Sequence, residues 1–196
     1  MLRVGLTGSM AAGKSTVLRE IAAMGVPTYS ADEAVHQLYA GEAAPIIEAA
    51  FPGTVDKGVV DRKKLAAALA DQPGLLGELE SLIHPLVRQK AMKFFDAAEA
   101  QGADIAVLEV PLLFETGTVY GLDKVIVTVT DPAIQRERAL ARAGMSGEKF
   151  EFLLSRQLDQ AEKRARADIV IDTSGTMDDT IARTRAAIAA LRSTKA

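Results

Sequence analysis

The segment that most constrains the fold of this chain is GSMAAGKS, residues 8–15, which fits the pattern G-x-x-x-x-G-K-[ST]. A short apolar, strand-like stretch at residues 2–7 precedes it, and apolar residues at helical spacing follow it at 17–24. A strand, a glycine-bounded loop and a helix are the context in which this pattern binds phosphate. An ordinary glycine-containing turn is the alternative, which this context disfavours.

Each residue type in the segment has a physical task in binding a phosphate. Gly8 and Gly13 allow backbone dihedrals closed to other residues, so that successive N–H groups can point inward around an anion. The dipole of the following helix adds positive potential. Lys14 is expected to reach the β- and γ-phosphates of ATP, and the Ser15 hydroxyl to bind Mg²⁺. The expected ATP contacts of the loop are Gly8, Ala11, Ala12, Gly13, Lys14, Ser15 and Thr16.

Composition limits the remaining function classes. The 196 residues are 48% hydrophobic and 25% charged, which suits one α/β domain with insertions. The net charge of −3 provides no global basic field that would recruit nucleic acid. With no cysteine and two histidines, a disulfide framework or a zinc centre is disfavoured. Neither a membrane span nor a signal peptide is evident, so we expect a cytoplasmic protein without nucleic-acid or membrane partners, and favour a monomer.

A second candidate residue is Asp32, which stands where a strand-like stretch at residues 26–30 gives way to a helical pattern at 33–39. Because the carboxyl ends of parallel strands line the ligand crevice, Asp32 is expected on the same side of the sheet as the phosphate loop. A carboxylate there is within reach of the γ-phosphate. A plain helix N-cap, a role that Asp fills well, is an equally weighted alternative.

Residues 41–100 differ in character, because prolines and glycines divide them into short helices and no convincing strand is present. Asp61 is the expected cap of a helix at 63–69. A long helical pattern at 75–100 is interrupted after His84 by Pro85, which should kink or restart the helix. A helical block inserted in a nucleotide-binding core favours a substrate-gripping subdomain, with a structural elaboration as the alternative.

Three further strands are predicted at residues 104–110, 122–130 and 167–172, with a closing amphipathic helix at 177–191. Glu109 is the last but one residue of the first of these strands, and Glu115 follows shortly after the strand. Either carboxylate could reach a metal ion or its waters. Either could equally be a solvated or ion-paired acid.

An arginine-rich helix at residues 134–142, with Asp131 at its cap, and a second helix at 148–163 are joined by a glycine-bounded tip. Two basic helices joined in this way indicate a lid that closes over the phosphates and excludes water. Arg138 and Arg142 are four residues apart and share a face of the first helix. A solvated charged face explains any single arginine better, but it does not explain the whole hairpin.

Together these elements predict an α/β fold of the P-loop nucleotide-kinase type, with three layers, a five-stranded parallel sheet, a helical insert and a lid. We expect one domain, with its core at residues 1–40, 101–135 and 160–196, the insert at 41–100 and the lid at 136–159. The sequence lacks the Asn-Lys-x-Asp motif of GTPases and is short for a motor. A kinase for a small, nucleotide-like acceptor fits best, and a nucleotide-gated binding module is the non-enzymatic alternative.

Five segments in order also carry a family resemblance: GLTG…GKST at 5–16, AD at 31–32, HPL at 84–86, VPLLFE at 110–115 and ADIVID at 167–172. In order and spacing they resemble dephospho-CoA kinases over nearly the whole chain. PLLFE and HPL are far more specific than the loop. The resemblance implies transfer of the ATP γ-phosphate, with Mg²⁺, to the ribose 3′-hydroxyl of dephospho-CoA.

The resemblance also implies roles for single residues. Asp32 would be the catalytic base, with Lys14 and Ser15 as the ATP and Mg²⁺ contacts. Residues 41–100 would bind the acceptor, with His84 and Arg88 at or near it. The ATP phosphates would be covered by two lid residues, Arg138 and Arg142, and Arg142 is a further catalytic candidate.

This chain departs from the family pattern at three places. Ser30 stands where the family usually has the first Asp of an Asp-Ala-Asp pattern, so only the second Asp of that pattern, Asp32, is present. The loop has less glycine than usual, but its middle positions need not all take positive φ. The turn after Asp172, which the resemblance places near adenine, has Thr173 where Asn is common.

Overall fold

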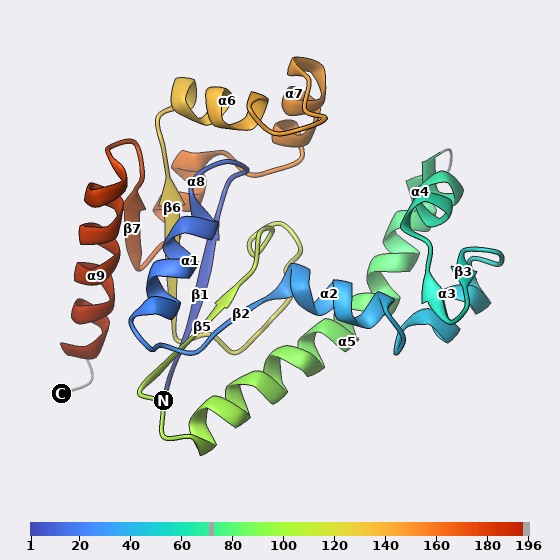
Figure 1. Cartoon of the computed structure of the whole chain (residues 1–196), viewed down its shortest axis with the longest axis horizontal. Coiled ribbons are helices and arrows are strands. Elements are labelled where there is room, and N and C mark those ends of the chain that lie inside the picture. The colour runs from blue at the N-terminus through green and yellow to red at the C-terminus, as the bar shows by residue number, and fades with distance from the viewer. Residues whose placement is uncertain (71–72, 194–196) are drawn as a thin grey trace. The chain divides into compact units, whose positions relative to one another are not determined.

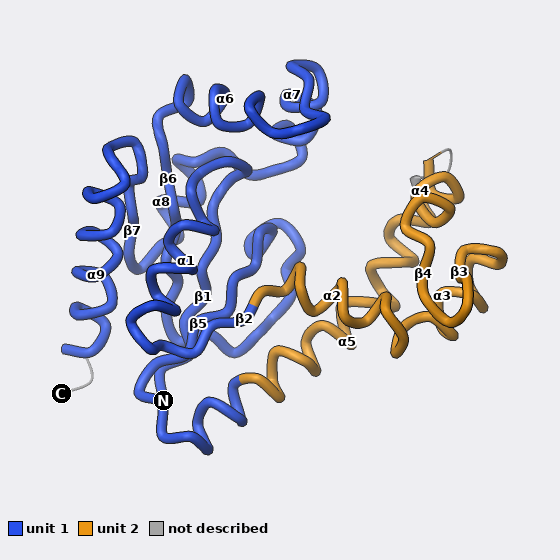
Figure 2. Tube along the Cα trace, viewed as in Figure 1, with its two compact units in different colours: residues 1–29, 95–196 blue, residues 30–94 orange. Residues whose placement is uncertain are grey.

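A computed structural model describes residues 1–70 and 73–193 of the chain. Packing divides the chain into two compact units, residues 1–29 with 95–196, and residues 30–94, which Figure 2 shows in blue and orange. These units are defined by packing, whereas the predicted insert and lid are defined by the ligand each would bind or cover. The functional insert at 41–100 and the lid at 136–159 therefore stay predictions.

A five-stranded sheet organises the first unit, with the strand order β2-β5-β1-β6-β7. Its strands are β1 (Leu2–Gly8), β2 (Thr28–Ser30), β5 (Ile105–Glu109), β6 (Lys124–Val129) and β7 (Ile169–Asp172). β1 runs parallel to β5 and to β6, and β6 runs parallel to β7. Every residue of β5 is buried, as expected for a parallel strand covered on both faces. The predicted five-stranded parallel architecture is confirmed.

Two helices pack together on the sheet: α1 (Lys14–Ala23) and α9 (Met177–Ser193) (Figure 1). α1 also contacts β1, and α9 contacts β7. Their apolar faces and the strands form one core. Its buried members are Val4, Leu6, Val17, Ile21, Val26, Ile105, Val107, Ile126, Ile171, Ala187, Ile188 and Leu191. This core fixes the end of β1, and hence the start of the phosphate loop.

The predicted arginine-rich hairpin consists of α6 (Pro132–Leu140) and α7 (Gly147–Ser155), and α8 (Gln160–Ala165) follows it. Asp131 caps α6 as expected, accepting hydrogen bonds from the N–H groups of residues 133 and 134. The prediction of a single helix at 148–163 is wrong, because α7 ends at Ser155 and α8 begins as a separate helix at Gln160. The Asp159 side chain accepts a hydrogen bond from the Glu162 N–H and starts α8 as a separate helix.

The second unit contains α2 (Ala31–Tyr39), α3 (Ala44–Ala50), α4 (Arg62–Ala70) and most of α5 (Pro73–Ala100). The expectation of no strand at 41–100 is wrong, because β3 (Val55–Asp56) pairs with β4 (Val59–Val60) in an antiparallel hairpin. Lys57 and Gly58, at the turn, have φ angles of 50° and 80°, which a two-residue hairpin turn of this type requires.

The long helix α5 continues through Pro85, so that of the two outcomes expected there, a kink or a restart, the restart is wrong. A proline inside a helix costs about 3 kcal/mol, so packing must offset that cost. A stripe of buried side chains at helical spacing runs past the proline on both sides. It comprises Leu79, Ile83, Val87, Ala91 and Phe95. No helix within the described ranges is long and apolar enough to cross a membrane.

Candidate functional site

The loop after β1 has the backbone geometry of a phosphate cradle. Gly8 has a φ of 150° and Gly13 a φ of 82°, both in the region that favours glycine. A Cβ atom at Gly8 would lie 2.2 Å from Thr128 Oγ1 on the neighbouring strand, and one at Gly13 would lie 2.9 Å from the Thr173 side chain. Both glycines are therefore required by φ and by close packing.

Ala11 is the middle position that takes a left-handed conformation without being glycine, with a φ of 61°. A Cβ in this region costs about 1–2 kcal/mol. Its side chain is buried with Ala139 of α6 and Phe150 of α7. The loop with little glycine thus reaches a glycine-like shape, and packing and hydrogen bonds must offset the strain.

Lys14 and Ser15 begin α1 directly after the loop. The Lys14 ammonium donates hydrogen bonds to the carbonyl oxygens of Gly8 at 2.6 Å and of Ser9 at 3.3 Å, so it lies over the loop. Gly13, at the N-cap, has no side chain that could occupy the first N–H groups of α1, and no acid stands in the first turn. This end of the helix suits an anion. Ser15 is exposed there, whereas the Thr16 hydroxyl accepts a 3.5 Å hydrogen bond from Arg19.

Two glutamines that sequence reasoning missed hold the loop at Met10. The side chain of Gln135 donates to the Met10 carbonyl at 2.7 Å, and Gln157 accepts from the Met10 N–H at 2.9 Å. Gln135 is buried on α6, four residues before buried Ala139. An amide on the apolar face of a predicted helix was the available signal for Gln135. No local pattern marks Gln157.

Arg138 and the turn after β7 meet beside the loop. The Arg138 guanidinium donates to Thr173 Oγ1 at 3.1 Å, to the Thr173 carbonyl at 2.9 Å and to Thr130 Oγ1 at 3.4 Å. Thr173 Oγ1 in turn lies 3.3 Å from the Ala12 carbonyl, to which it can donate. In the same turn, hydrogen bonds from Ser174 are the main cause that lowers the pKa of Asp172 below its usual value. Arg138 thus joins the hairpin to this turn, and its contact with ATP stays a prediction.

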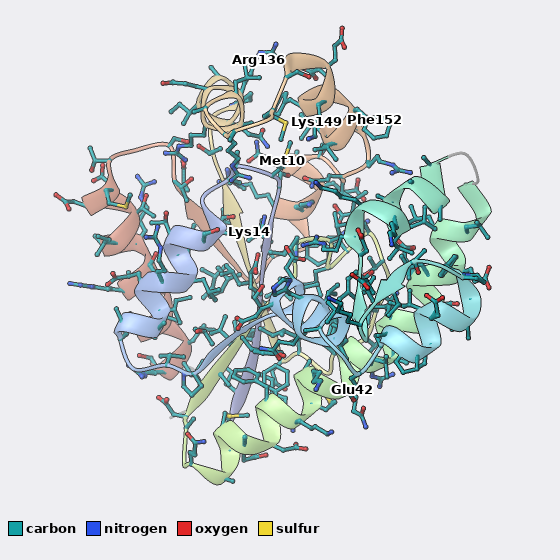
Figure 3. All side chains as sticks on the ribbon, turned by 45° about the vertical axis from the view of Figure 1, so that its right-hand side comes forward. Met10, Lys14, Glu42, Arg136, Lys149 and Phe152 are labelled. Atoms are coloured by element: carbon teal, nitrogen blue, oxygen red, sulfur yellow. The ribbon has the colours of Figure 1, made fainter. Side chains whose placement is uncertain are left out.

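The other predicted lid residue, Arg142, differs from its neighbours in the hairpin. It is exposed in the turn after α6, and its guanidinium has no partner among the residues that the structure describes. Arg136, by contrast, forms an ion pair with Glu151 and lies 5.6 Å from the ring centre of Phe150. Figure 3 shows Arg136 and Lys149 on the hairpin next to the loop that carries Met10. The Lys149 ammonium donates to the Gly144 carbonyl at 3.2 Å, so Arg142 is the one of these three hairpin cations without a partner in the described chain.

Of the two alternatives left open for Glu115, the structure supports the ion pair. Its Oε1 lies 2.7 Å from the ammonium of Lys163, whose side chain is 0% exposed, and accepts the Leu158 N–H at 3.0 Å. Glu109 is buried at the end of β5, in register with Leu6 of β1. Neither observation assigns a metal contact.

The remaining candidates lie in the second unit. Asp32 is exposed in the first turn of α2, and the N-cap position is occupied by Ser30. The cap alternative for Asp32 is therefore wrong. On α5, His84 is half-buried and Arg88, one turn later, is exposed. None of these three side chains has a partner within residues 1–70 and 73–193.

A divalent cation fits this arrangement as a companion of the nucleotide. Across the described ranges, no group of three or more His, Asp or Glu side chains could hold a metal ion by itself. Mg²⁺ commonly keeps several waters and binds through one or two protein oxygens plus substrate phosphates. The exposed Ser15 hydroxyl at the start of α1 offers one protein oxygen of that type, and its contact with a metal ion stays a prediction.

Comparisons with known proteins agree with this geometry. The family described as "Dephospho-CoA kinase" matches residues 2–179. The dephospho-CoA kinase of Brucella melitensis is 52% identical over 179 residues, covering 91% of this chain and 90% of that protein. The crystal structure of TT1252 from Thermus thermophilus superposes with a TM-score of 0.84 at 30% identity, covering 96% of each chain. A dephospho-CoA kinase from Campylobacter jejuni gives 0.68 at 25% identity, covering 95% of each. The chain belongs to the dephospho-CoA kinase family.

Proposed function

We propose that this protein transfers the γ-phosphate of ATP to the ribose 3′-hydroxyl of dephospho-CoA, giving CoA and ADP, the final step of coenzyme A synthesis. The observation that carries this function is the family match over residues 2–179, which includes the phosphate loop, the hairpin and the second unit together. ATP and dephospho-CoA are then the small-molecule partners.

The proposed donor half of the site is the phosphate loop with the start of α1. Its N–H groups and Lys14 would hold the β- and γ-phosphates, and Arg142 would approach the γ-phosphate from the hairpin. These cations would neutralise negative charge that spreads over the transferring group. Support comes from the positive-φ glycines, from Lys14 lying over the loop, and from the exposed, unpartnered guanidinium of Arg142 within the described chain.

The family's use of ATP implies a divalent cation, and we propose Mg²⁺ with Ser15 as its protein ligand. Bound there, Mg²⁺ would supply charge neutralisation on the phosphate oxygens. Ser15 would orient it through one hydroxyl oxygen.

The proposed acceptor half consists of Asp32, His84 and Arg88. The Asp32 carboxylate would accept the proton of the 3′-hydroxyl while its oxygen attacks the γ-phosphorus and ADP leaves. Its exposure, and its position after the N-cap, leave the carboxylate available for this task. His84 and Arg88 would bind the acceptor; the exposed guanidinium of Arg88 suits an anionic group such as a phosphate.

A coupled ADP-release assay with ATP and Mg²⁺ tests the function. We expect dephospho-CoA to support rapid ADP release, whereas adenosine and AMP do not. ADP release that is equal with all three acceptors, or that requires no acceptor, would contradict the assignment.

A further inference from the structure

Met10 of the phosphate loop is bound by two side chains, one on α6 and one in the segment that follows α7. Its carbonyl accepts from Gln135 on α6, and its N–H donates to Gln157 in the linker between α7 and α8. Both polar backbone groups of one loop residue are thus bound by side chains that lie far away in sequence. Neither glutamine belongs to the phosphate-loop motif.

Further hydrogen bonds hold the Gln135 side chain and the backbone next to Gln157. Gln160 donates to the Gln135 side-chain oxygen at 3.1 Å and exchanges two hydrogen bonds with the backbone of Thr130 at the end of β6. The Leu158 N–H, next to Gln157, is bound by Glu115. The side chain of Gln135 and the backbone beside Gln157 are therefore held in place before any ligand arrives, which reduces the entropy lost on binding.

The residue after Met10 is the strained one. Ala11 has the left-handed φ of 61°, and its neighbours Ser9 and Ala12 are joined by a 3.1 Å backbone hydrogen bond. The free energy of an alanine falls when it leaves this conformation, so the loop needs an external restraint to keep Ala11 there. The contacts on Met10 are placed directly before the strained residue.

We propose that Gln157 and Gln135 are positioning residues for ATP, which hold Met10 and thereby keep Ala11 in the conformation that shapes the phosphate cradle. The inference rests on the proposed function only in that the loop binds ATP. The affinity for ATP would then depend on two side chains that act through the Met10 backbone.

The test is Gln157→Met, which keeps the length of the side chain and removes the acceptor oxygen. We expect the dissociation constant for ATP, measured by calorimetry without acceptor, to rise about 5-fold, the usual value of one hydrogen bond. The KM for dephospho-CoA should stay near the parental value. Gln101→Met, on the exposed turn after α5, is the matched control and should bind ATP like the parent.

A second substitution separates positioning from general destabilisation. Ala11→Gly removes the strain, so the double variant Gln157→Met with Ala11→Gly should recover most of the lost ATP affinity. Unchanged ATP binding in Gln157→Met would overturn the proposal. A loss that Ala11→Gly does not recover, together with an equal rise in the KM for dephospho-CoA, would overturn it too.

Amide hydrogen exchange in the parent protein provides a readout that needs no variant to fold. The Met10 amide should exchange slowly both without and with ATP, because Gln157 holds it in either state. Fast exchange without ATP contradicts the proposal. Because ATP affinity and exchange need no acceptor, these outcomes are independent of whether dephospho-CoA is phosphorylated.

Discussion

The phosphate loop and the proposed acceptor residues differ in how their functional groups are held. The loop is bound by side chains from α6, from the α7–α8 linker and from the turn after β7. Asp32, His84 and Arg88 are exposed or half-buried and have no partner in the described parts of the chain. The backbone groups of the phosphate loop are thus held in place before ATP binds. The acceptor residues, by contrast, would be ordered by the substrate itself. Substitutions of the loop and of Asp32, the residues proposed to act on the transferring group, should therefore lower kcat, whereas substitution of Arg88 should raise the KM for the acceptor.

The largest effect is expected for Lys14→Ala. Removing the ammonium leaves charge on the transferring phosphoryl group without its partner, so kcat should fall about 10³-fold. Steady-state kinetics with saturating acceptor, together with a thermal melt, measure this loss. Parental turnover in a folded Lys14→Ala protein would show that the loop does not bind the reacting phosphates.

A smaller but still large loss is expected for Asp32→Asn. The amide cannot accept the hydroxyl proton, so kcat should fall about 10²-fold or more while ATP affinity is kept. Glu33→Gln is the control, because Glu33 is the exposed neighbour in the same turn and accepts a hydrogen bond from Gln37. If both variants have the same kcat, Asp32 is not the catalytic base, and the acceptor residues then only bind the substrate.

Arg142→Ala should lower kcat about 10-fold, the scale of one hydrogen bond to a charged group. Its melting temperature should stay near the parental value, because Arg142 has no partner to lose within the described residues. Arg136→Ala is the matched control in the same hairpin, since it breaks the ion pair with Glu151 and should leave kcat nearly unchanged. A lower melting point with parental kcat in Arg142→Ala would reduce this arginine to a structural role.

The smallest effect is expected for Arg88→Ala. An exposed cation that binds an anionic acceptor group contributes little, so the KM for dephospho-CoA should rise about 5-fold with kcat and the KM for ATP unchanged. Gln89→Ala, the exposed neighbour on α5, is the control. A rise in the KM for ATP, with the KM for dephospho-CoA unchanged, would contradict the proposal that Arg88 binds the acceptor and the loop binds ATP.

The sequence predicted the parallel sheet and the phosphate loop well, because both depend on local patterns. Apolar runs mark buried strands, and the loop motif specifies its own backbone. The β3–β4 hairpin was missed because each strand has only two residues, and because Lys57-Gly58 lacks the Asn or Asp that usually precedes Gly in such a turn. Whether α5 restarts at Pro85 was left open, because the packing that offsets the local cost of the proline is not visible in the sequence.

The sequence predicted the backbone conformation of the loop, but it did not predict the side chains that hold the loop in place. Gln157 is separated by 147 residues from Met10, so no local pattern could have paired them. The same holds for Thr173, 35 residues from Arg138. Long-range hydrogen bonds depend on the packed fold, and only their polar partners are visible in the sequence.

The most direct test of the central claim follows the phosphoryl group itself. ATP labelled at the γ-phosphate is incubated with the protein, Mg²⁺ and dephospho-CoA, and the position of the label in the product is determined. The account predicts label on the ribose 3′-oxygen of CoA, in amounts equal to the ADP formed. Label found only in inorganic phosphate, or at any other position of the acceptor, would contradict it.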